Sequence, residues 1–260
     1  MILTLLSDFG LSDVYVAVMK GAIAQINPAL TVVDLTHQVL PQDIAMARFH
    51  LMTAYPYFPA GTVYVAIVDP GVGSLRRAIA VQLEAGFLVA PDNGLVSGVL
   101  SQNSAIAAVE LTDPFYWRTS SPSTTFHGRD IFAPVGAHLA SGVPLRKLGT
   151  EIDLQTIVQL PIANPTRIGN TILGMIQAID HFGNLITNIS GSEVAEKFWS
   201  VKIEDSTYPG KTTYSDSEPG EILALVGSHG WVEIAASRAN AQAKLNLKWG
   251  SVISVVVDGN

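Results

Sequence analysis

Strand-like and helix-like segments alternate along the first 150 residues of the chain. Apolar runs of high strand propensity, such as Thr31 to Leu35 and Thr62 to Val68, flank segments with apolar residues at helical spacing, such as Val14 to Ile26. Because a helix between two strands returns the chain in a parallel direction, this order predicts an α/β fold with a mostly parallel sheet flanked by helices. The other expected elements are strands at Ile2 to Leu6, Ala78 to Leu83, Phe87 to Val89 and Ala105 to Leu111, and helices at Asp43 to Ala54, Leu95 to Leu100 and Ile131 to Ala140.

The pattern changes after about residue 160. Pro161-Ile162-Ala163-Asn164-Pro165 is rich in turn residues, and the apolar runs beyond it are short and separated at hairpin spacing. This spacing predicts a small antiparallel β-barrel or sandwich, with strands at Thr171 to Ile179, Leu185 to Ile189, Ile222 to Val226, Trp231 to Ala235 and Val252 to Val257. We therefore expect an α/β N-terminal domain at 1–160, a linker at 161–169 and a smaller C-terminal β-barrel domain at 170–260.

Composition excludes several classes of function. The chain has no cysteine, so disulfides, thiolate metal sites and cysteine nucleophiles are ruled out. Its formal charge is −7, and its fifteen lysine and arginine residues are scattered, so we expect neither a nucleic-acid partner nor binding to an anionic membrane. Without a bilayer-length apolar run or the features of a signal peptide, the sequence predicts a cytoplasmic protein with a small-molecule partner.

The run Val65-Ala66-Ile67-Val68-Asp69 ends an apolar strand in an acid, and Pro70-Gly71-Val72-Gly73 turns the chain before Arg76. In α/β proteins, sites lie where parallel strands end. His127, on a second short turn, completes a candidate catalytic set with Asp69 and Arg76, in which the arginine fixes the carboxylate and the histidine accepts a proton from water. The structural alternative is that Asp69 caps the turn, Arg76 lies on the surface and His127 is a core histidine.

Further polar groups suit the binding of a nucleoside. Asp8 follows the first strand, where a carboxylate can accept both hydroxyls of a ribose or simply cap a helix. Asp180-His181-Phe182-Gly183-Asn184 places polar groups around an aromatic ring, as does Ser228-His229-Gly230-Trp231 with Glu233, although either run could be an ordinary hairpin turn. The phosphate-binding glycine loops and the serine-hydrolase elbow are absent from the sequence.

A metal site is the main rival interpretation, because oxygen and nitrogen ligands are numerous. No pair has the close spacing of known metal motifs, and we expect no metal and no cofactor. The available ligands are Asp8, His37, His50, Asp69, Asp92, His127 and His181.

Five motifs in the same order resemble the S-adenosyl-L-methionine (SAM) hydroxide adenosyltransferase family, which is related to fluorinating and chlorinating enzymes. They span nearly the whole chain: Ser7-Asp8-Phe9-Gly10, Val68-Asp69-Pro70-Gly71-Val72-Gly73, Ala90-Pro91-Asp92-Asn93-Gly94, Phe126-His127-Gly128-Arg129-Asp130 and Asp180-His181-Phe182-Gly183-Asn184-Leu185-Ile186-Thr187-Asn188. The resemblance implies a homotrimer with active sites between subunits. It also implies that water displaces L-methionine from the ribose 5′ carbon of SAM and releases adenosine.

The resemblance assigns the water-handling triad to Asp69, Arg76 and His127, and the ribose-binding acid to Asp8. By the same resemblance, Asp180 and Ser228 hold the methionine amino group, and Phe182 and Asn184 form the adenine-side wall. His229 stands where the fluorinating relatives carry an arginine near the substrate carboxylate. Glu233 is included as a further substrate-binding candidate.

Two other functions fit the same scaffold. A halide-using transferase is disfavoured because the fluorinating relatives carry an insertion near Glu84-Ala85-Gly86, lack the acid and histidine found at Asp69 and His127, and have a halide-binding serine at the position of Gly128. A glycine there resembles the chlorinating relatives. A non-catalytic nucleoside or SAM sensor would bind without turnover and would not need a proton-handling triad.

Overall fold

The structure is a computed structural model, and it describes residues 1–258. The chain divides into two compact units, Met1–Leu160 and the part that begins at Pro161.

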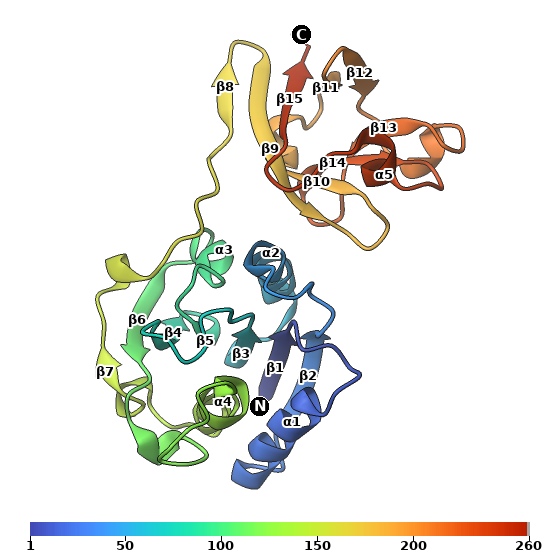
Figure 1. The fold of residues 1–260 in the computed structure, drawn as a ribbon. Helices are drawn as coiled ribbons and strands as arrows, with labels where there is room; N and C mark the ends of the chain where they lie inside the picture. The colour runs from blue at the N-terminus through green and yellow to red at the C-terminus, as the bar shows by residue number, and fades with distance from the viewer. Residues whose placement is uncertain (259–260) are drawn as a thin grey trace. The chain divides into compact units, whose positions relative to one another are not determined.

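The first unit is built on a seven-stranded sheet, counted over the described residues, with the order β2-β1-β3-β5-β4-β6-β7 (Figure 1). Its strands are β1 (Ile2–Ser7), β2 (Thr31–Thr36), β3 (Thr62–Ile67), β4 (Ala78–Leu83), β5 (Gly86–Pro91), β6 (Ala105–Glu110) and β7 (Thr150–Glu151). The pairs β1–β2, β1–β3 and β3–β5 are parallel, whereas β4–β5, β4–β6 and β6–β7 are antiparallel. The sheet is therefore mixed, because the tight turn after β4 reverses the chain directly into β5.

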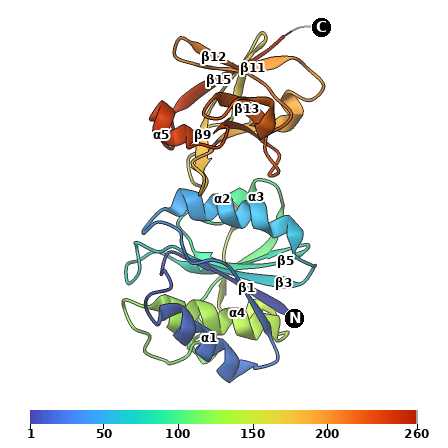
Figure 2. The ribbon, with the colours of Figure 1, turned by 90° about the vertical axis from the view of Figure 1, so that its right-hand side faces the viewer.

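Helices cover both faces of this sheet (Figure 2). One face packs against α1 (Tyr15–Ile26) and α4 (Ala133–Ala140), and the other against α2 (Ile44–Ala54) and α3 (Ser97–Leu100). Contact with the first face is close at Gly136 of α4, where an added Cβ would lie 2.4 Å from Cγ2 of Val65. Single helical turns lie at Tyr55–Tyr57, Pro114–Tyr116, Leu145–Lys147 and Leu154–Thr156, and a π-helical segment, η3, spans Gly128–Phe132.

The second unit is antiparallel. Eight strands over the described residues form one sheet with the path β12-β11-β15-β9-β10-β14-β13, and β8 pairs with β9 beside it. A bridge between Gly210, after β12, and Ala224 of β13 nearly closes the sheet into a barrel. The elements are β8 (Thr166–Ile168), β9 (Thr171–Ile179), β10 (Leu185–Ser190), β11 (Trp199–Ile203), β12 (Ser206–Pro209), β13 (Ile222–Val226), β14 (Trp231–Ala236), β15 (Val252–Val257), α5 (Ala241–Leu245) and the turns Gly191–Glu193 and Tyr214–Asp216.

The expected fold class, an α/β unit followed by a smaller antiparallel β unit, is confirmed. Four strands were not expected from the sequence: β7, β8, β11 and β12. Three of them are short and largely exposed, and β11 has a polar residue between its buried ones, so none shows a long apolar run. β8 lies within the range expected to link the two domains. None of the helices formed by residues 1–258 combines the length and apolar composition that crossing a bilayer requires.

Candidate active site

Asp69 and Arg76 face each other across the loop that joins β3 to β4. The loop is folded by its own hydrogen bonds, since Val72 N donates to Asp69 O at 3.2 Å and Ser74 Oγ donates to Gly71 O at 2.7 Å. Arg76 binds this carboxylate in a bidentate way: Nε donates to Oδ1 at 2.9 Å and Nη2 donates to Oδ2 at 2.5 Å. The side chains of Arg76 and Asp69 are only 11% and 6% exposed, so this pair is largely shielded from solvent.

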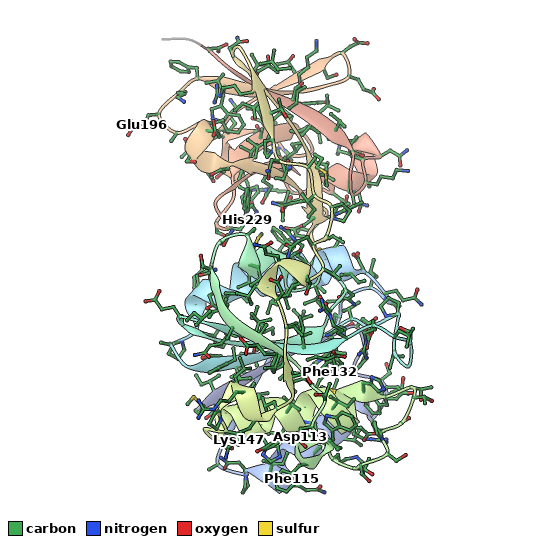
Figure 3. All side chains as sticks on the ribbon, turned by 90° about the vertical axis from the view of Figure 1, so that its left-hand side faces the viewer. Asp113, Phe115, Phe132, Lys147, Glu196 and His229 are labelled. Carbon is green, nitrogen blue, oxygen red and sulfur yellow. The ribbon has the colours of Figure 1, made fainter. Side chains whose placement is uncertain are left out.

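His127 reaches this pair from a distant part of the sequence. Its Nδ1 lies 2.8 Å from Arg76 Nη2. Gly73 makes the approach of the two loops possible: its φ is +78°, and a Cβ there would lie 2.4 Å from the carbonyl oxygen of Thr124. Beneath the triad, the ring of Phe132 lies under the Arg76 guanidinium, with 5.2 Å from Cζ to the ring centroid. Figure 3 labels Phe132 in the interior of the first unit.

The contact with Arg76 fixes the state of the His127 ring. A guanidinium can only donate, so Nδ1 of His127 must accept, and a neutral ring then carries its proton on Nε2. Burial and the nearby charge of Arg76 lower the pKa of His127, while Asp69 and Asp130 act in the opposite direction. In this arrangement His127 is neutral and presents an N–H group at Nε2, whereas Asp69 Oδ1 accepts one hydrogen bond and retains a free lone pair.

Asp130 holds the segment that carries His127, although it was not among the residues expected in the site. Asp130 is fully buried in η3 and accepts hydrogen bonds from Arg118 Nε at 2.5 Å, Arg129 Nε at 2.7 Å and Ser123 N at 2.9 Å. Burial alone would raise the pKa of Asp130, but these donors outweigh it and hold the pKa well below its usual range. The polar loop that includes Arg118 and Ser123 is thus tied to a buried carboxylate next to the triad.

Asp8 follows β1 at the same edge of the sheet as Asp69. Its Oδ2 accepts a hydrogen bond from the backbone N–H of Gln42 at 2.8 Å. Gln42 has a φ of +69°, which lies in the left-handed region that residues other than glycine rarely adopt. The structure therefore holds Asp8 by a backbone donor, and it does not cap α1, whose N-cap is Val14.

In the second unit, the expected Asp180 turn is tightly organised. Asp180 Oδ1 accepts from the backbone N–H groups of Phe182 at 2.9 Å and Asn184 at 2.8 Å, and Oδ2 accepts from Asn184 Nδ2 at 2.9 Å. The amide of Asn184 is buried, whereas the Phe182 ring is 72% exposed. The turn thus exposes the apolar ring of Phe182 to solvent, and the hydrogen bonds of Asp180 hold its backbone in place.

Ser228 and Glu233 belong to the β13–β14 hairpin and differ in character. Ser228 is exposed on the hairpin turn, but Glu233 is 2% exposed. Glu233 Oε1 accepts from Tyr214 Oη at 2.8 Å, and Oε2 lies 3.0 Å from Nε2 of His229. Burial, together with the Glu233 carboxylate, raises the pKa of Tyr214, so this hydroxyl stays protonated. Both carboxylate oxygens of Glu233 already have protein partners, so Glu233 supports the hairpin from within.

Two of the remaining candidate metal ligands, Asp92 and His37, are hydrogen-bonded to other groups of the first unit. Asp92 is bound by Arg77 Nε at 2.8 Å and by Val158 N at 2.8 Å, and His37 contacts Ser7. Over residues 1–258, no group of three or more histidine, aspartate or glutamate side chains is placed to hold a metal ion. Surface cavities of about 430 and 680 Å³ are lined by other parts of the first unit, and Figure 3 labels Asp113 and Lys147 of the second cavity.

A polar triad beside the carboxyl end of the parallel strand β3, on an α/β unit followed by an antiparallel β unit, is typical of proteins that bind a small molecule at the ends of their strands. Residues 3–149 match the SAM hydroxide adenosyltransferase N-terminal domain, and residues 174–254 match its C-terminal domain. The chain belongs to the SAM hydroxide adenosyltransferase family.

Individual relatives agree over nearly the full length. An (R)-S-adenosyl-L-methionine hydrolase from Salinispora tropica is 39% identical over 96% of this chain and 95% of its own length. An (R)-S-adenosyl-L-methionine hydrolase from Thermus thermophilus is 38% identical over 96% of this chain and 98% of its own length. A fluorinase from Actinoplanes sp. is 28% identical over 98% of this chain and 97% of its own length. A solved structure of an uncharacterized conserved protein from Thermotoga maritima, 33% identical, superposes with a TM-score of 0.90 over 98% of this chain and 100% of that chain.

Proposed function

We propose that this protein hydrolyses SAM to adenosine and L-methionine. The observation that carries the proposal is the triad itself: Arg76 joins the largely buried Asp69 carboxylate to the His127 imidazole beside the end of β3. Hydrolase relatives at 33–39% identity support the same activity.

The reaction needs little from the protein beyond alignment. The water oxygen attacks the ribose 5′ carbon from the side opposite sulfur, the new C–O bond forms as the C–S bond breaks, and the bonding pair leaves with sulfur to give neutral methionine thioether. One water proton is released. Because a sulfonium is already a good leaving group, no redox or electrophilic cofactor is required, and rate enhancement comes from holding water in line.

The geometry divides the work within the triad. His127 has its Nδ1 lone pair engaged by Arg76, so Nε2–H donates to the water oxygen and orients it. Asp69 Oδ1 retains a lone pair that can accept the proton as the attacking oxygen becomes acidic. This differs from the expectation that His127 accepts the proton, since its acceptor atom is occupied.

Five residues bind the substrate in this proposal. The Asp8 carboxylate accepts hydrogen bonds from the ribose hydroxyls, Asp180 and Ser228 hold the methionine amino group, and Phe182 and Asn184 contact adenine. The exposed positions of the Phe182 ring and of Ser228 support these roles. Glu233 acts through the hairpin, because its oxygens are engaged by Tyr214 and His229.

We also propose that the protein works as a cytoplasmic homotrimer with its sites at subunit interfaces, and with domains at 1–160 and 170–260 joined by 161–169. An exposed apolar group at the start of α1 supports a subunit contact near the site: Leu11 is 65%, Val14 68% and Tyr15 46% exposed. Tyr15 in turn contacts Phe9 and Phe126 beside the His127 segment. Mass measurement of the native protein in solution tests the trimer, and limited proteolysis tests the linker.

A halide-using transferase is the competing function, since fluorinases are among the relatives. The halide-binding serine of the fluorinating relatives would replace Gly128 here, and its side chain would fit only if neighbouring side chains moved. A Cβ there would lie 3.2 Å from the Phe126 ring and 3.3 Å from Met19 Sδ.

The test is incubation of purified protein with SAM in H₂¹⁸O, with and without chloride and with and without a chelator. Adenosine carrying ¹⁸O at the 5′ oxygen, formed in equal amounts under all conditions, supports the proposal. Chlorinated nucleoside would assign the protein to the halogenating branch, chelator-sensitive turnover would restore a metal mechanism, and unchanged bound SAM would indicate a sensor. Asp69→Asn serves as the matched inactive control.

A further inference from the structure

A second buried polar cluster lies at the ends of β1 and β2. Ser7, the last residue of β1, is fully buried, and its Oγ lies 2.7 Å from Nδ1 of His37, the residue that follows β2. His37 is itself 3% exposed. On the other side of the ring, Nε2 lies 3.2 Å from Oδ1 of Asp34, which also pairs with Lys20 at 2.6 Å. The cluster therefore runs from the interior to the surface.

The charges set the direction of the Ser7–His37 hydrogen bond. Within residues 1–258, Nε2 of His37 has no hydrogen bond of good geometry, so its contact with Asp34 is electrostatic. Burial would raise the pKa of Asp34, but Lys20 and His37 outweigh it and lower the pKa. A carboxylate beside Nε2 favours the proton on that nitrogen, so Nδ1 accepts and the Ser7 hydroxyl donates.

This cluster is not a nucleophilic triad, because Ser7 is 0% exposed and no substrate can reach its hydroxyl. Its role follows from what it holds. Ser7 Oγ accepts the backbone N–H of Phe9 at 3.3 Å, and the carbonyl of His37 accepts the N–H of Gly10 at 2.8 Å. The segment Ser7-Asp8-Phe9-Gly10 is therefore attached to His37 at both of its ends.

Asp8 lies between these two attachments. The connection that follows His37 also supplies the Gln42 N–H that binds Asp8 Oδ2 at 2.8 Å. One side-chain bond and one backbone bond of His37 thus fix the loop, and a third bond from the same connection orients the carboxylate.

We propose that His37 is a positioning residue for Asp8, and that through Ser7 it aims this carboxylate at the ribose hydroxyls of the substrate. The inference rests on the proposed function. His37 does not touch the substrate; it acts by fixing the loop that carries the substrate-binding acid.

The experiment compares His37→Ala, His37→Asn and His37→Gln. The asparagine amide can place its oxygen near the position of Nδ1 and still accept from Ser7, whereas the glutamine amide reaches toward the position of Nε2. Ser7→Ala removes the same hydrogen bond while leaving the histidine, and so provides a second route if His37→Ala fails to fold. His138→Asn, which alters a half-buried histidine packed edge-to-face against Tyr116, is the matched control.

The readouts are the Kd values of adenosine and 2′,3′-dideoxyadenosine, with kcat and KM for SAM. We expect the wild type to prefer adenosine, and His37→Ala, His37→Gln and Ser7→Ala to reduce that preference by about 10-fold or more, the range expected for losing hydrogen bonds to a charged group. His37→Asn and the control should stay within about threefold of wild type on the same scale. KM for SAM should rise more than kcat falls, because ribose contacts exist in both ground and transition states.

Equal loss of affinity for both nucleosides would overturn the inference, because it would show a general structural role. An unchanged preference in His37→Ala and Ser7→Ala would overturn it as well. If the wild type shows no preference, the Asp8 assignment and this inference fail together. If the wild type shows the preference but never turns over SAM, the hydrolase proposal fails while the positioning role of His37 stands.

Discussion

Replacing His127 by glutamine separates the two roles that an imidazole can play at this position. A glutamine amide can place an N–H near the position of Nε2, but it cannot take up a proton at neutral pH. If His127 orients water through Nε2–H, as its bond to Arg76 implies, His127→Gln retains part of the activity that His127→Ala loses.

The expected sizes follow from the contacts. His127→Ala removes the water donor and leaves Arg76 Nη2 bound to Asp69 alone. Loss of one preorganised donor of this kind costs about 100- to 1000-fold in kcat. The glutamine variant should recover at least about tenfold of this loss, and Asp69→Asn, which removes the proposed proton acceptor, should fall by about 100-fold or more.

Single-turnover release of adenosine from SAM, measured from pH 5 to 9, tests this reasoning. In the wild type, protonation of His127 removes the acceptor for Arg76, so the rate should fall as the pH drops below the lowered pKa of His127 and stay flat above it. His127→Gln should lack this acidic limb. A glutamine variant as inactive as His127→Ala, with Asp69→Asn retaining most of its activity, would refute the assignment and make His127 the proton acceptor.

Other substitutions test the scaffold around the triad. Gly73→Ala should reduce kcat by orders of magnitude without loss of secondary structure by circular dichroism, because the added Cβ meets the Thr124 carbonyl at 2.4 Å; wild-type activity would contradict the close approach. Asp130→Asn should lower the free energy of unfolding by about 3 kcal/mol in urea titrations, since it leaves Arg118 and Arg129 without their buried partner; a change below about 1 kcal/mol would contradict this. Burial lowers the pKa of His50, His127 and His138, so the unfolded chain binds protons at a higher pH than the folded one, and stability should fall as the pH drops below about 6.5; a flat urea midpoint between pH 7 and 5 would contradict this.

The sequence could predict the elements that bury an apolar face and the carboxylates that end them. Strand β3 is buried along its whole length and ends just before Asp69, and this pattern is legible as an apolar run followed by a turn. The hairpin of β4 and β5 could also be predicted, from two apolar runs joined by the tight turn Glu84-Ala85-Gly86, whereas the two-residue, exposed strand β7 has no apolar period and could not.

Long-range pairings within the site could not be predicted from spacing. Arg76 and His127 are 51 residues apart, and their loops meet only in the folded chain, where Gly73 packs on Thr124 and Arg76 binds His127. The support by Asp130 was hidden for a similar reason, since one of its donors is the backbone N–H of Ser123, which any residue except proline could supply. The occupied oxygens of Glu233 were hidden in the same way, because Tyr214 lies 19 residues earlier in the chain.

The donor and acceptor balance of the triad bears on which nucleophile it suits. A halide carries no proton, so a halide site needs donors and is weakened by a nearby carboxylate. Water needs a donor to hold its oxygen and an acceptor for the proton that it loses. The Nε2–H of His127 and the free lone pair of Asp69 supply one of each, and Arg76 neutralises the carboxylate without occupying all of its lone pairs. The same pairing leaves the triad with no net charge, so the cationic sulfonium is not repelled while a proton-bearing nucleophile is favoured over an anion.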